Sequence, residues 1–145
     1  MSEISIERIR NFTPETFDAY RHLIYQLPDP VIDVSEEDFK EMLEEDNTYL
    51  LMASVEEAEM IGMAVLNIQK HPVRKGDLAA VVVDETHRNR HIGRILCQEA
   101  QKIAFDLNLM MISATVDECN SAVMHMLRNV QFTDSKHQQK LTYKV

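Results

Sequence analysis

The sequence predicts a single α/β domain in which a mixed, mostly antiparallel sheet of about seven strands carries helices on both faces. Three observations support this prediction. The 145 residues are 45% hydrophobic and 27% charged, values typical of a globular domain. Apolar segments with strand periodicity and helix periodicity alternate along the chain. With only three Gly and four Pro the chain has no flexible linker, so we expect one domain over residues 1–145.

The first third of the chain predicts one strand followed by two helices. The segment "ISIERIR" alternates apolar and polar residues from Ile4 to Arg10, as a half-buried strand does. Thr13 and Pro14 are typical of the cap and first residue of a helix, which we expect to run to about Leu27. The segment "SEED" at residues 35–38 resembles a capping box and predicts a second, short helix.

The middle of the chain predicts a hairpin, a central strand and a long helix. Two apolar segments at residues 48–55 and 60–69 are joined by an acidic turn, which favours a hairpin. After a loop at 70–77, residues 78–84 are apolar on both faces and predict a buried strand. An amphipathic helix follows at 92–107.

The last third predicts a strand, a helix and two weak strands. Residues 109–116 form another apolar run, and Asn120 can cap the helix that follows. The weak strands lie around Phe132 and from Gln139 to Tyr143. The predicted order is β-α-α-β-β-β-α-β-α-β-β, and its central strand–helix–strand unit should be a right-handed parallel crossover.

Positive charge gathers at the start of the long helix, although the net charge of the chain is −9. Arg88, Arg90, His91 and Arg94 occupy the approach and the first turn. A helix N-terminus is itself positive, so such residues there are unfavourable unless an anion joins them. Free backbone N–H groups at a helix start bind phosphate, and Gly93 would let a phosphate approach closely. We therefore expect a polyphosphate or pyrophosphate ligand; the alternative is that the arginines are solvated surface residues.

Several other functions are disfavoured. The acidic charge argues against general binding to nucleic acid or to anionic membranes. No apolar run reaches the ~20 residues of a membrane span, and the N-terminal segment lacks a signal-peptide core. Cys97 and Cys119 lack metal-ligand spacing, so we expect no metal and reduced thiols in a cytoplasm. Neither a P-loop nor a dinucleotide-binding glycine pattern is present.

The basic turn resembles a known family motif. The segment "RNRHIG", from Arg88 to Gly93, is similar to motif A of the GNAT superfamily of acyl-CoA-dependent N-acyltransferases, written Q/R-x-x-G-x-G/A. His91 stands where the motif has its first glycine. The predicted order of elements matches that family along essentially the whole chain.

A second segment strengthens the resemblance. Residues 120–132, "NSAVMHMLRNVQF", are similar to the family segment N-x-x-A-x-x-x-Y-x-x-x-G-F. Asn120 and Phe132 fit that pattern, whereas Leu127 replaces the tyrosine and Gln131 replaces the glycine.

The resemblance implies how acetyl-CoA, the acyl donor, would bind. Arg88 would shape the turn, and Asn120 is also expected at the coenzyme. The end of the preceding strand, Val81 to Val83, would pair its main chain with the pantetheine arm. The backbone amides implied to hold the pyrophosphate are those of Asn89, Arg90, His91, Ile92, Gly93 and Arg94.

The usual catalytic residues of the family are not found where the resemblance would place them. The strand positions for a glutamate base hold Ala79 and Ala80, and the tyrosine acid is Leu127. Asp77, expected just before the strand, is the nearest carboxylate and is a candidate base acting through water. Cys119 is a candidate acid for the departing thiolate, with an inert buried thiol as the favoured alternative.

The expected function is therefore direct transfer of an acetyl group from acetyl-CoA to an amine of a small molecule or peptide. One alternative is a CoA-binding or metabolite-sensing module with little or no turnover. Another is a different phosphate-binding protein that shares only the helix start. We expect an amine substrate, no nucleic-acid or membrane partner, and either a monomer or a homodimer.

Overall fold

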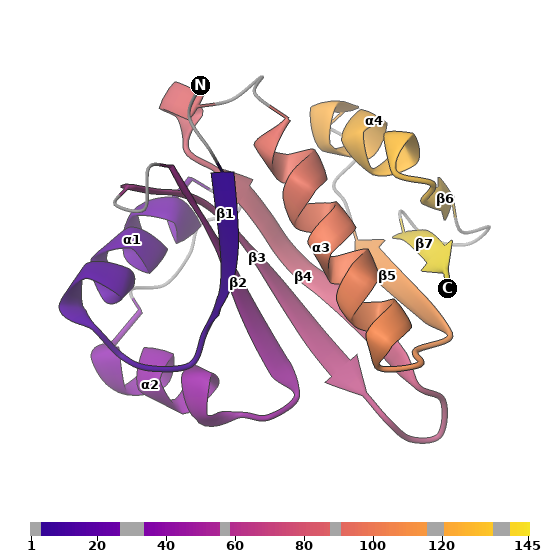
Figure 1. The fold of residues 1–145 in the computed structure, drawn as a ribbon, viewed down its shortest axis with the longest axis horizontal. Coiled ribbons are helices and arrows are strands. Elements are labelled where there is room, and N and C mark those ends of the chain that lie inside the picture. Colours follow the sequence, from indigo (N-terminus) through magenta and orange to yellow (C-terminus); the bar gives the residue numbers. More distant parts are fainter. Residues whose placement is uncertain (1–3, 27–33, 56–58, 88–90, 116–120, 135–139) are drawn as a thin grey trace.

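The computed structural model describes residues 4–26, 34–55, 59–87, 91–115, 121–134 and 140–145. It contains a seven-stranded sheet in the order β1-β2-β3-β4-β5-β7-β6 (Figure 1). The predicted α/β fold class and the predicted order of elements are confirmed. The strands are β1 (Ile4–Ile9), β2 (Thr48–Val55), β3 (Glu59–Gln69), β4 (Lys75–Val83), β5 (Met111–Thr115), β6 (Thr133–Asp134) and β7 (Lys140–Lys144). The helices are α1 (Pro14–Ile24), α2 (Glu36–Glu44), α3 (Ile92–Asp106) and α4 (Ser121–Asn129), with a 3-10 turn, η1 (Glu85–His87).

The sheet is mixed as predicted, because one pair of neighbouring strands is parallel and the others are antiparallel. The parallel pair is β4 and β5, which α3 connects. A parallel pair needs such a crossover, and the long amphipathic α3 supplies it.

Helices α1 and α2 begin where the sequence predicts. The Thr13 hydroxyl accepts a hydrogen bond from the Thr16 amide at 3.1 Å, and the Ser35 hydroxyl accepts one from the Asp38 amide at 3.1 Å. Helix α1 ends at Ile24, earlier than the predicted end at Leu27, which lies outside the described residues.

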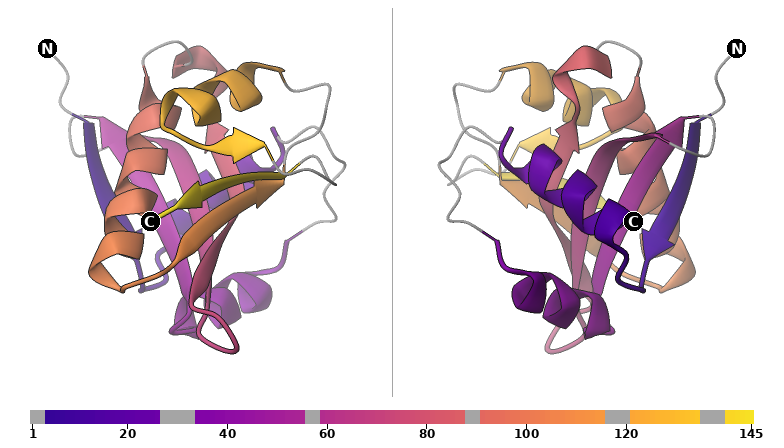
Figure 2. Two further views of the ribbon diagram at one scale, coloured as in Figure 1. Left: turned by 90° about the vertical axis from the view of Figure 1, so that its right-hand side faces the viewer. Right: turned by 90° about the vertical axis from the view of Figure 1, so that its left-hand side faces the viewer.

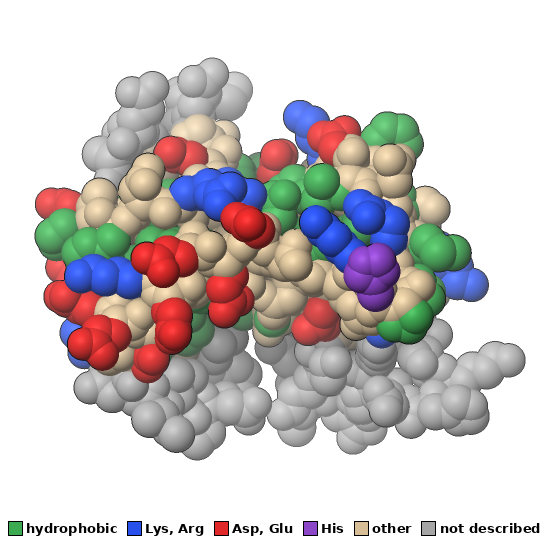
Figure 3. Space-filling view, turned by 90° about the horizontal axis from the view of Figure 1, so that it is seen from below, with side chains coloured by type: hydrophobic (Ala, Val, Ile, Leu, Met, Phe, Trp, Pro, Cys, Tyr) green, Lys and Arg blue, Asp and Glu red, His purple; other side chains and the backbone are tan. Residues whose placement is uncertain are grey.

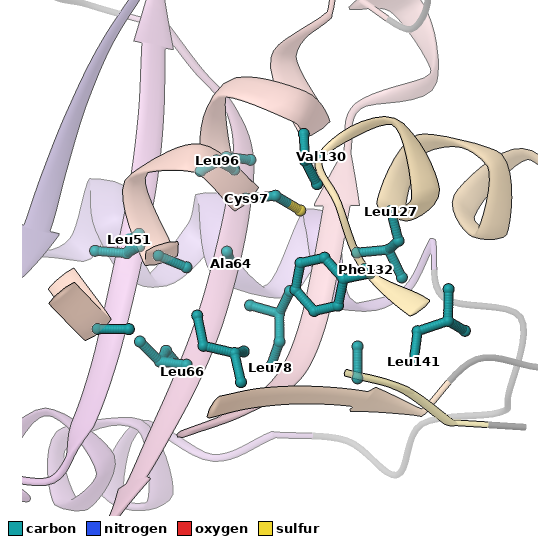
Figure 4. Close-up of a cluster of buried hydrophobic side chains, with 14 of the residues drawn as sticks. Leu51, Ala64, Leu66, Leu78, Leu96, Cys97, Leu127, Val130, Phe132 and Leu141 are labelled. Atoms are coloured by element: carbon teal, nitrogen blue, oxygen red, sulfur yellow. The ribbon is translucent and has the colours of Figure 1, made fainter. Parts of the chain in front are cut away.

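Two hydrophobic clusters cover the two faces of the sheet. Alternate residues of β2 divide between them: Leu51 and Ala53 pack under α3, whereas Leu50 and Met52 pack under α1 and α2. Figure 2 shows α1 and α2 on one side of the sheet and α3 on the other. The cluster under α3 also receives α4 (Figure 4), and its labelled members are Leu51, Ala64, Leu66, Leu78, Leu96, Cys97, Leu127, Val130, Phe132 and Leu141.

Strand β4 begins three residues earlier than predicted, which corrects the placement of Asp77. The sequence predicts a loop over 70–77, yet β4 starts at Lys75 and Asp77 lies within it. Gly76 makes this possible, because a Cβ there would lie only 3.0 Å from Leu66 Cδ1 in the core. Asp77 points to the opposite face and is exposed, so its polarity is compatible with a strand.

Two β-bulges interrupt the ladders on either side of β3. Ile61 is the extra residue between β3 and β2, since Ala53 pairs with Gly62 and Ser54 with Met60. Ala79 is the extra residue of β4, because Val65 pairs with Ala80 and Leu66 with Leu78. A bulge bends its strand and increases the local twist.

Replacing Gly62 by alanine should destabilise the fold, whereas the same change at Gly93 should not. A Cβ at Gly62 would lie 3.2 Å from both the Val82 carbonyl oxygen and Ile92 Cγ2, while at Gly93 the nearest atom, Met126 Sδ, is 3.5 Å away. We expect Gly62→Ala to lower the free energy of unfolding by about 1–3 kcal/mol. Gly93→Ala should change it by less than about 1 kcal/mol. Equal effects in urea denaturation would contradict this difference in packing.

Candidate functional site

The candidate site begins where β4 and β5 part. Their parallel ladder ends at the pair Leu78–Ala114, whereas β4 continues to Val83 and stays paired with β3 along the way. In Figure 1, β4 runs on toward the top of the view beyond the end of β5. The bulge at Ala79 lies immediately after the last parallel pair. The described parts of the two strands thus form a fork, and the main chain of β4 after Leu78 lies past the end of the described ladder with β5.

The N-terminus of α3 is the second part of the site. The helix begins at Ile92, as predicted, and its cap residue His91 makes no side-chain capping bond. The first helical hydrogen bond runs from the Ile95 amide to the His91 carbonyl oxygen at 3.0 Å. The amides of Ile92, Gly93 and Arg94 therefore have no helical acceptor, and no side chain in the described ranges accepts from them. Such a helix start can bind an anion.

The charged side chains of this turn are only partly described. His91 and Arg94 are exposed at the helix start. The other predicted ligands of the turn, Arg88, Asn89 and Arg90, lie outside the described residues.

His91 and Gln131, which replace two glycines of the family patterns, keep the backbone that a glycine would favour. Their φ angles are 59° and 78°, both in the left-handed region. Such angles cost a non-glycine residue about 1–2 kcal/mol. The chain has therefore lost the glycines but kept both turns.

The lack of a side chain at Gly93 lets α3 pack closely against α4 and β4. A Cβ there would point toward Met126 of α4 and Val83 of β4, at ordinary contact distances of 3.5–3.6 Å. A methyl group fits, but a large side chain would press on the strand and the helix that flank the fork.

The turn between β4 and α3 is tied to the end of α1, which the sequence did not predict. Asp84 accepts hydrogen bonds from the amide and hydroxyl of Thr86, both at 3.2 Å. Its other oxygen lies 3.2 Å from His22 Nε2. Gln26 accepts from the Glu85 amide at 3.0 Å. Contacts 59 and 62 residues apart in sequence thus fix the approach to the helix start.

These contacts set the ionisation of Asp84. Burial would raise the pKa of its carboxyl, but the hydrogen bonds from Thr86 and the contact with His22 outweigh burial and lower the pKa below 3.8. The carboxylate is therefore ionised at neutral pH and holds the turn.

The candidate catalytic residues fall in different places. Asp77 lies in β4 on the face of α1 and α2, one position before the last parallel pair. Leu127 is 1% exposed and belongs to the core, as the sequence predicts, so it offers no proton. Cys119 and Asn120 lie outside the described residues.

Cys97 is not a candidate nucleophile. Burial raises the pKa of its thiol to about 12, and its Sγ lies 3.6 Å from Met126 Sδ. A thiol held neutral in the core is unreactive.

The described residues contain neither a metal-binding group nor a membrane-spanning helix. In these ranges no group of three or more His, Cys, Asp or Glu residues could hold a metal ion. No described helix is both long and apolar enough to cross a membrane.

Comparison of the sequence with family models gives one match, to the Acetyltransferase (GNAT) family over residues 9–132. The chain belongs to this family. The match includes the β4–β5 fork and the start of α3, so both parts of the candidate site lie within the GNAT region. Comparison with curated proteins finds no significant match.

Solved structures share the GNAT fold. An aminoglycoside acetyltransferase, meta-AAC0020, from an uncultured soil metagenomic sample, in complex with trehalose, matches with a TM-score of 0.78 and 16% identity, over 93% of this chain and 91% of that one. A chain of the NatC complex bound to Gag peptide and CoA matches with 0.79 and 20%, over 99% of both. The PaiA N-acetyltransferase of Thermoplasma acidophilum in complex with coenzyme A matches with 0.76 and 17%, over 97% and 99%.

Asp84→Asn should destabilise this GNAT domain at neutral pH but not in acid. The pKa of Asp84 is lowered on folding, so its contribution is fully present above about pH 3.8 and is lost as the pH falls through the folded-state pKa. We expect a loss of about 1 kcal/mol in the free energy of unfolding at pH 7. Denaturation at a series of pH values checks this. The exposed Asp18→Asn is the control, and a loss that persists at low pH would contradict the charge-based explanation.

Two substitutions at His91 should separate the contribution of its backbone conformation to stability from that of its imidazole ring. His91→Gly and His91→Val both remove the imidazole and both keep the backbone N–H. Because φ is 59°, valine should lower the free energy of unfolding by about 1–2 kcal/mol, whereas glycine should be neutral or stabilising. Similar losses in both variants, measured by thermal or chemical denaturation, would assign the effect to the ring instead.

Proposed function

We propose that the protein is an N-acetyltransferase that moves an acetyl group from acetyl-CoA to a primary amine. The proposal rests above all on the uncapped start of α3 beside the fork of β4 and β5. Membership of the GNAT family supports it, as do structural neighbours that were solved with CoA.

In this proposal the diphosphate of acetyl-CoA binds the amides of Ile92, Gly93 and Arg94. Arg94 adds positive charge, and Arg88 and Arg90 are expected to do so as well. The pantetheine arm then lies along Val81 to Val83, where the β5 ladder no longer runs. The pairing of β3 with β4 along this stretch supports the proposal, because it holds the β4 wall of the site in place before a ligand binds.

The reaction follows from bringing the amine to the thioester at the fork. The ammonium first loses one proton to water, and its nitrogen lone pair attacks the carbonyl carbon. A C–N bond forms, the C–S bond breaks, and the thiolate of CoA takes the second proton from the nitrogen. The products are an N-acetylated amine and CoA with a free thiol.

Proximity supplies most of the rate in this scheme. Leu127 is buried where the family pattern has a tyrosine, so the described residues provide no acid at that position. Cys119 stays a candidate proton donor for the departing thiolate. Holding two reactants in position can replace a dedicated acid or base, since alignment alone lowers the barrier substantially.

A second candidate function is a CoA-binding or sensing module with little turnover. This function is favoured by the absence of the usual catalytic side chains. Ala79 and Ala80 occupy the positions of the expected base, and Leu127 occupies that of the acid. The two functions share the acetyl-CoA site and differ only in release of the thiol.

Calorimetry with acetyl-CoA, CoA and ATP tests the site, and thiol release with a panel of amines tests turnover. We expect acetyl-CoA and CoA to bind and ATP to bind much more weakly, because ATP lacks the pantetheine arm. Arg94→Gln should raise the Kd of acetyl-CoA about fivefold, since it removes a charge beside the diphosphate. The exposed Lys102→Gln, two turns along the same helix, should leave it unchanged. Equal affinity for all three nucleotides would contradict the proposed site.

A further inference from the structure

A row of polar residues crosses the sheet at the closed end of the fork. Successive members face each other in register across neighbouring strands, from β2 through β3, β4, β5 and β7 to β6. The row consists of Thr48, Asn67, Asp77, Ser113, Thr142 and Thr133.

All these side chains lie on the face of α1 and α2. Their neighbours along each strand, such as Leu66, Leu78 and Ile112, belong to the cluster under α3. Side chains alternate between faces along a strand, so the side chains of the row point to the face of α1 and α2. Helix α1 packs on β3 and β4, and α2 packs on β2, which leaves β5 toward the far side of this face.

One member of the row, Ser113, has an unpaired hydroxyl. Its side chain is almost fully buried, at 4% exposure, yet its hydroxyl has no hydrogen-bond partner among the residues that the structure describes. Buried polar groups are normally paired, because an unpaired one loses its hydrogen bonds to water. Ser113 is paired in register with Asp77, so its hydroxyl and that carboxylate share one side of the sheet.

The rest of the row is partly bonded. The Thr48 hydroxyl lies 2.9 Å from Glu45 Oε2 and 3.1 Å from Asn67 Oδ1. Asp77 is exposed, and no cation in the described ranges forms an ion pair with it. The row therefore offers a free carboxylate beside a free hydroxyl.

The position of Asp77 fits a binding role better than a role at the reacting atoms. The thioester is expected near Ala80, past the end of the ladder at Leu78. At roughly 3.3 Å per residue, Ala80 lies at most about 10 Å along β4 from Asp77. An ammonium on Asp77 is then too far away to attack, but a second amine on the same short carbon chain can reach the fork.

The acids of α2 lie on the same side of the sheet as the row, while Lys75 and Lys144 are nearer to Asp77 on that face. Seen from below in Figure 3, acidic side chains gather on the side of α2, and basic side chains occur on both halves. The exposed acids of α2 are Glu36, Glu37, Asp38, Glu41 and Glu44.

We propose that this row binds the acceptor, and that the acceptor is a diamine: one ammonium is held by Asp77 with the Ser113 hydroxyl, while the other amine is acetylated at the fork. This inference rests on the proposed function. Asp77 is then a positioning residue for the substrate and not a base.

Three amines of matched length test the charge requirement: butylamine, 1,4-diaminobutane and 4-aminobutanoate. In an assay of thiol release, the KM should be lowest for 1,4-diaminobutane. Asp77→Asn should raise that KM about fivefold while leaving kcat and the KM of butylamine unchanged, because an exposed charge pair contributes little more than this. Ser113→Ala should raise the same KM by about twofold. The matched control is Asp106→Asn, an exposed acid at the end of α3.

The kinetic pattern decides between binding and catalysis. If Asp77→Asn lowers kcat for all amines and shifts the pH profile, Asp77 acts as a base and the proposal is wrong. Equal KM values for the three amines in the unchanged protein would also overturn it.

Binding without turnover gives an independent readout. Calorimetry of 1,4-diaminobutane with the CoA-saturated protein should show binding that Asp77→Asn weakens about fivefold and that butylamine does not match. Absence of diamine binding to a protein that does bind CoA overturns the acceptor proposal alone. Failure to bind CoA overturns the proposed function instead.

Discussion

Within the described residues, strand β4 is paired along its length with β3 and at only four positions with β5. This unequal pairing is the constraint on which the site depends. β3 fixes the direction of β4, the bulge at Ala79 bends it, and β5 departs at the same point. The result is a stretch of β4 that is held by β3 and lies past the end of the described ladder with β5, a geometry that a regular sheet would not provide. The uncapped start of α3 follows directly from this stretch through the turn held by Asp84.

The two replaced glycines show which property of the family motifs matters here. His91 and Gln131 lack the small size of glycine, but both keep its left-handed backbone. A backbone N–H binds an anion whatever side chain its residue carries, so the loss of glycine is compatible with a phosphate site. The loss of the tyrosine is different, because Leu127 is buried in the core and cannot serve as a proton donor.

Local signals in the sequence predicted much of the fold and, within the candidate site, the start of α3. The caps at Thr13 and Ser35 and the start of α3 at Ile92 depend on neighbouring residues, and all three were predicted correctly. The contact of Asp84 with His22 spans 62 residues, so no local pattern encodes it. The row through Asp77 and Ser113 was equally hidden, because it depends on strand register, and Asp77 was wrongly predicted to lie in a loop.

Under the proposed function, the amides at the start of α3 would also couple the supply of acetyl-CoA to the stability of the folded chain. An anion that needs the first turn of a formed helix binds the native state and not the unfolded one. Such a ligand at a hundred times its Kd adds about 2.7 kcal/mol to the free energy of unfolding. With acetyl-CoA bound as proposed, resistance to unfolding, and with it resistance to proteolysis, would rise and fall with the concentration of acetyl-CoA.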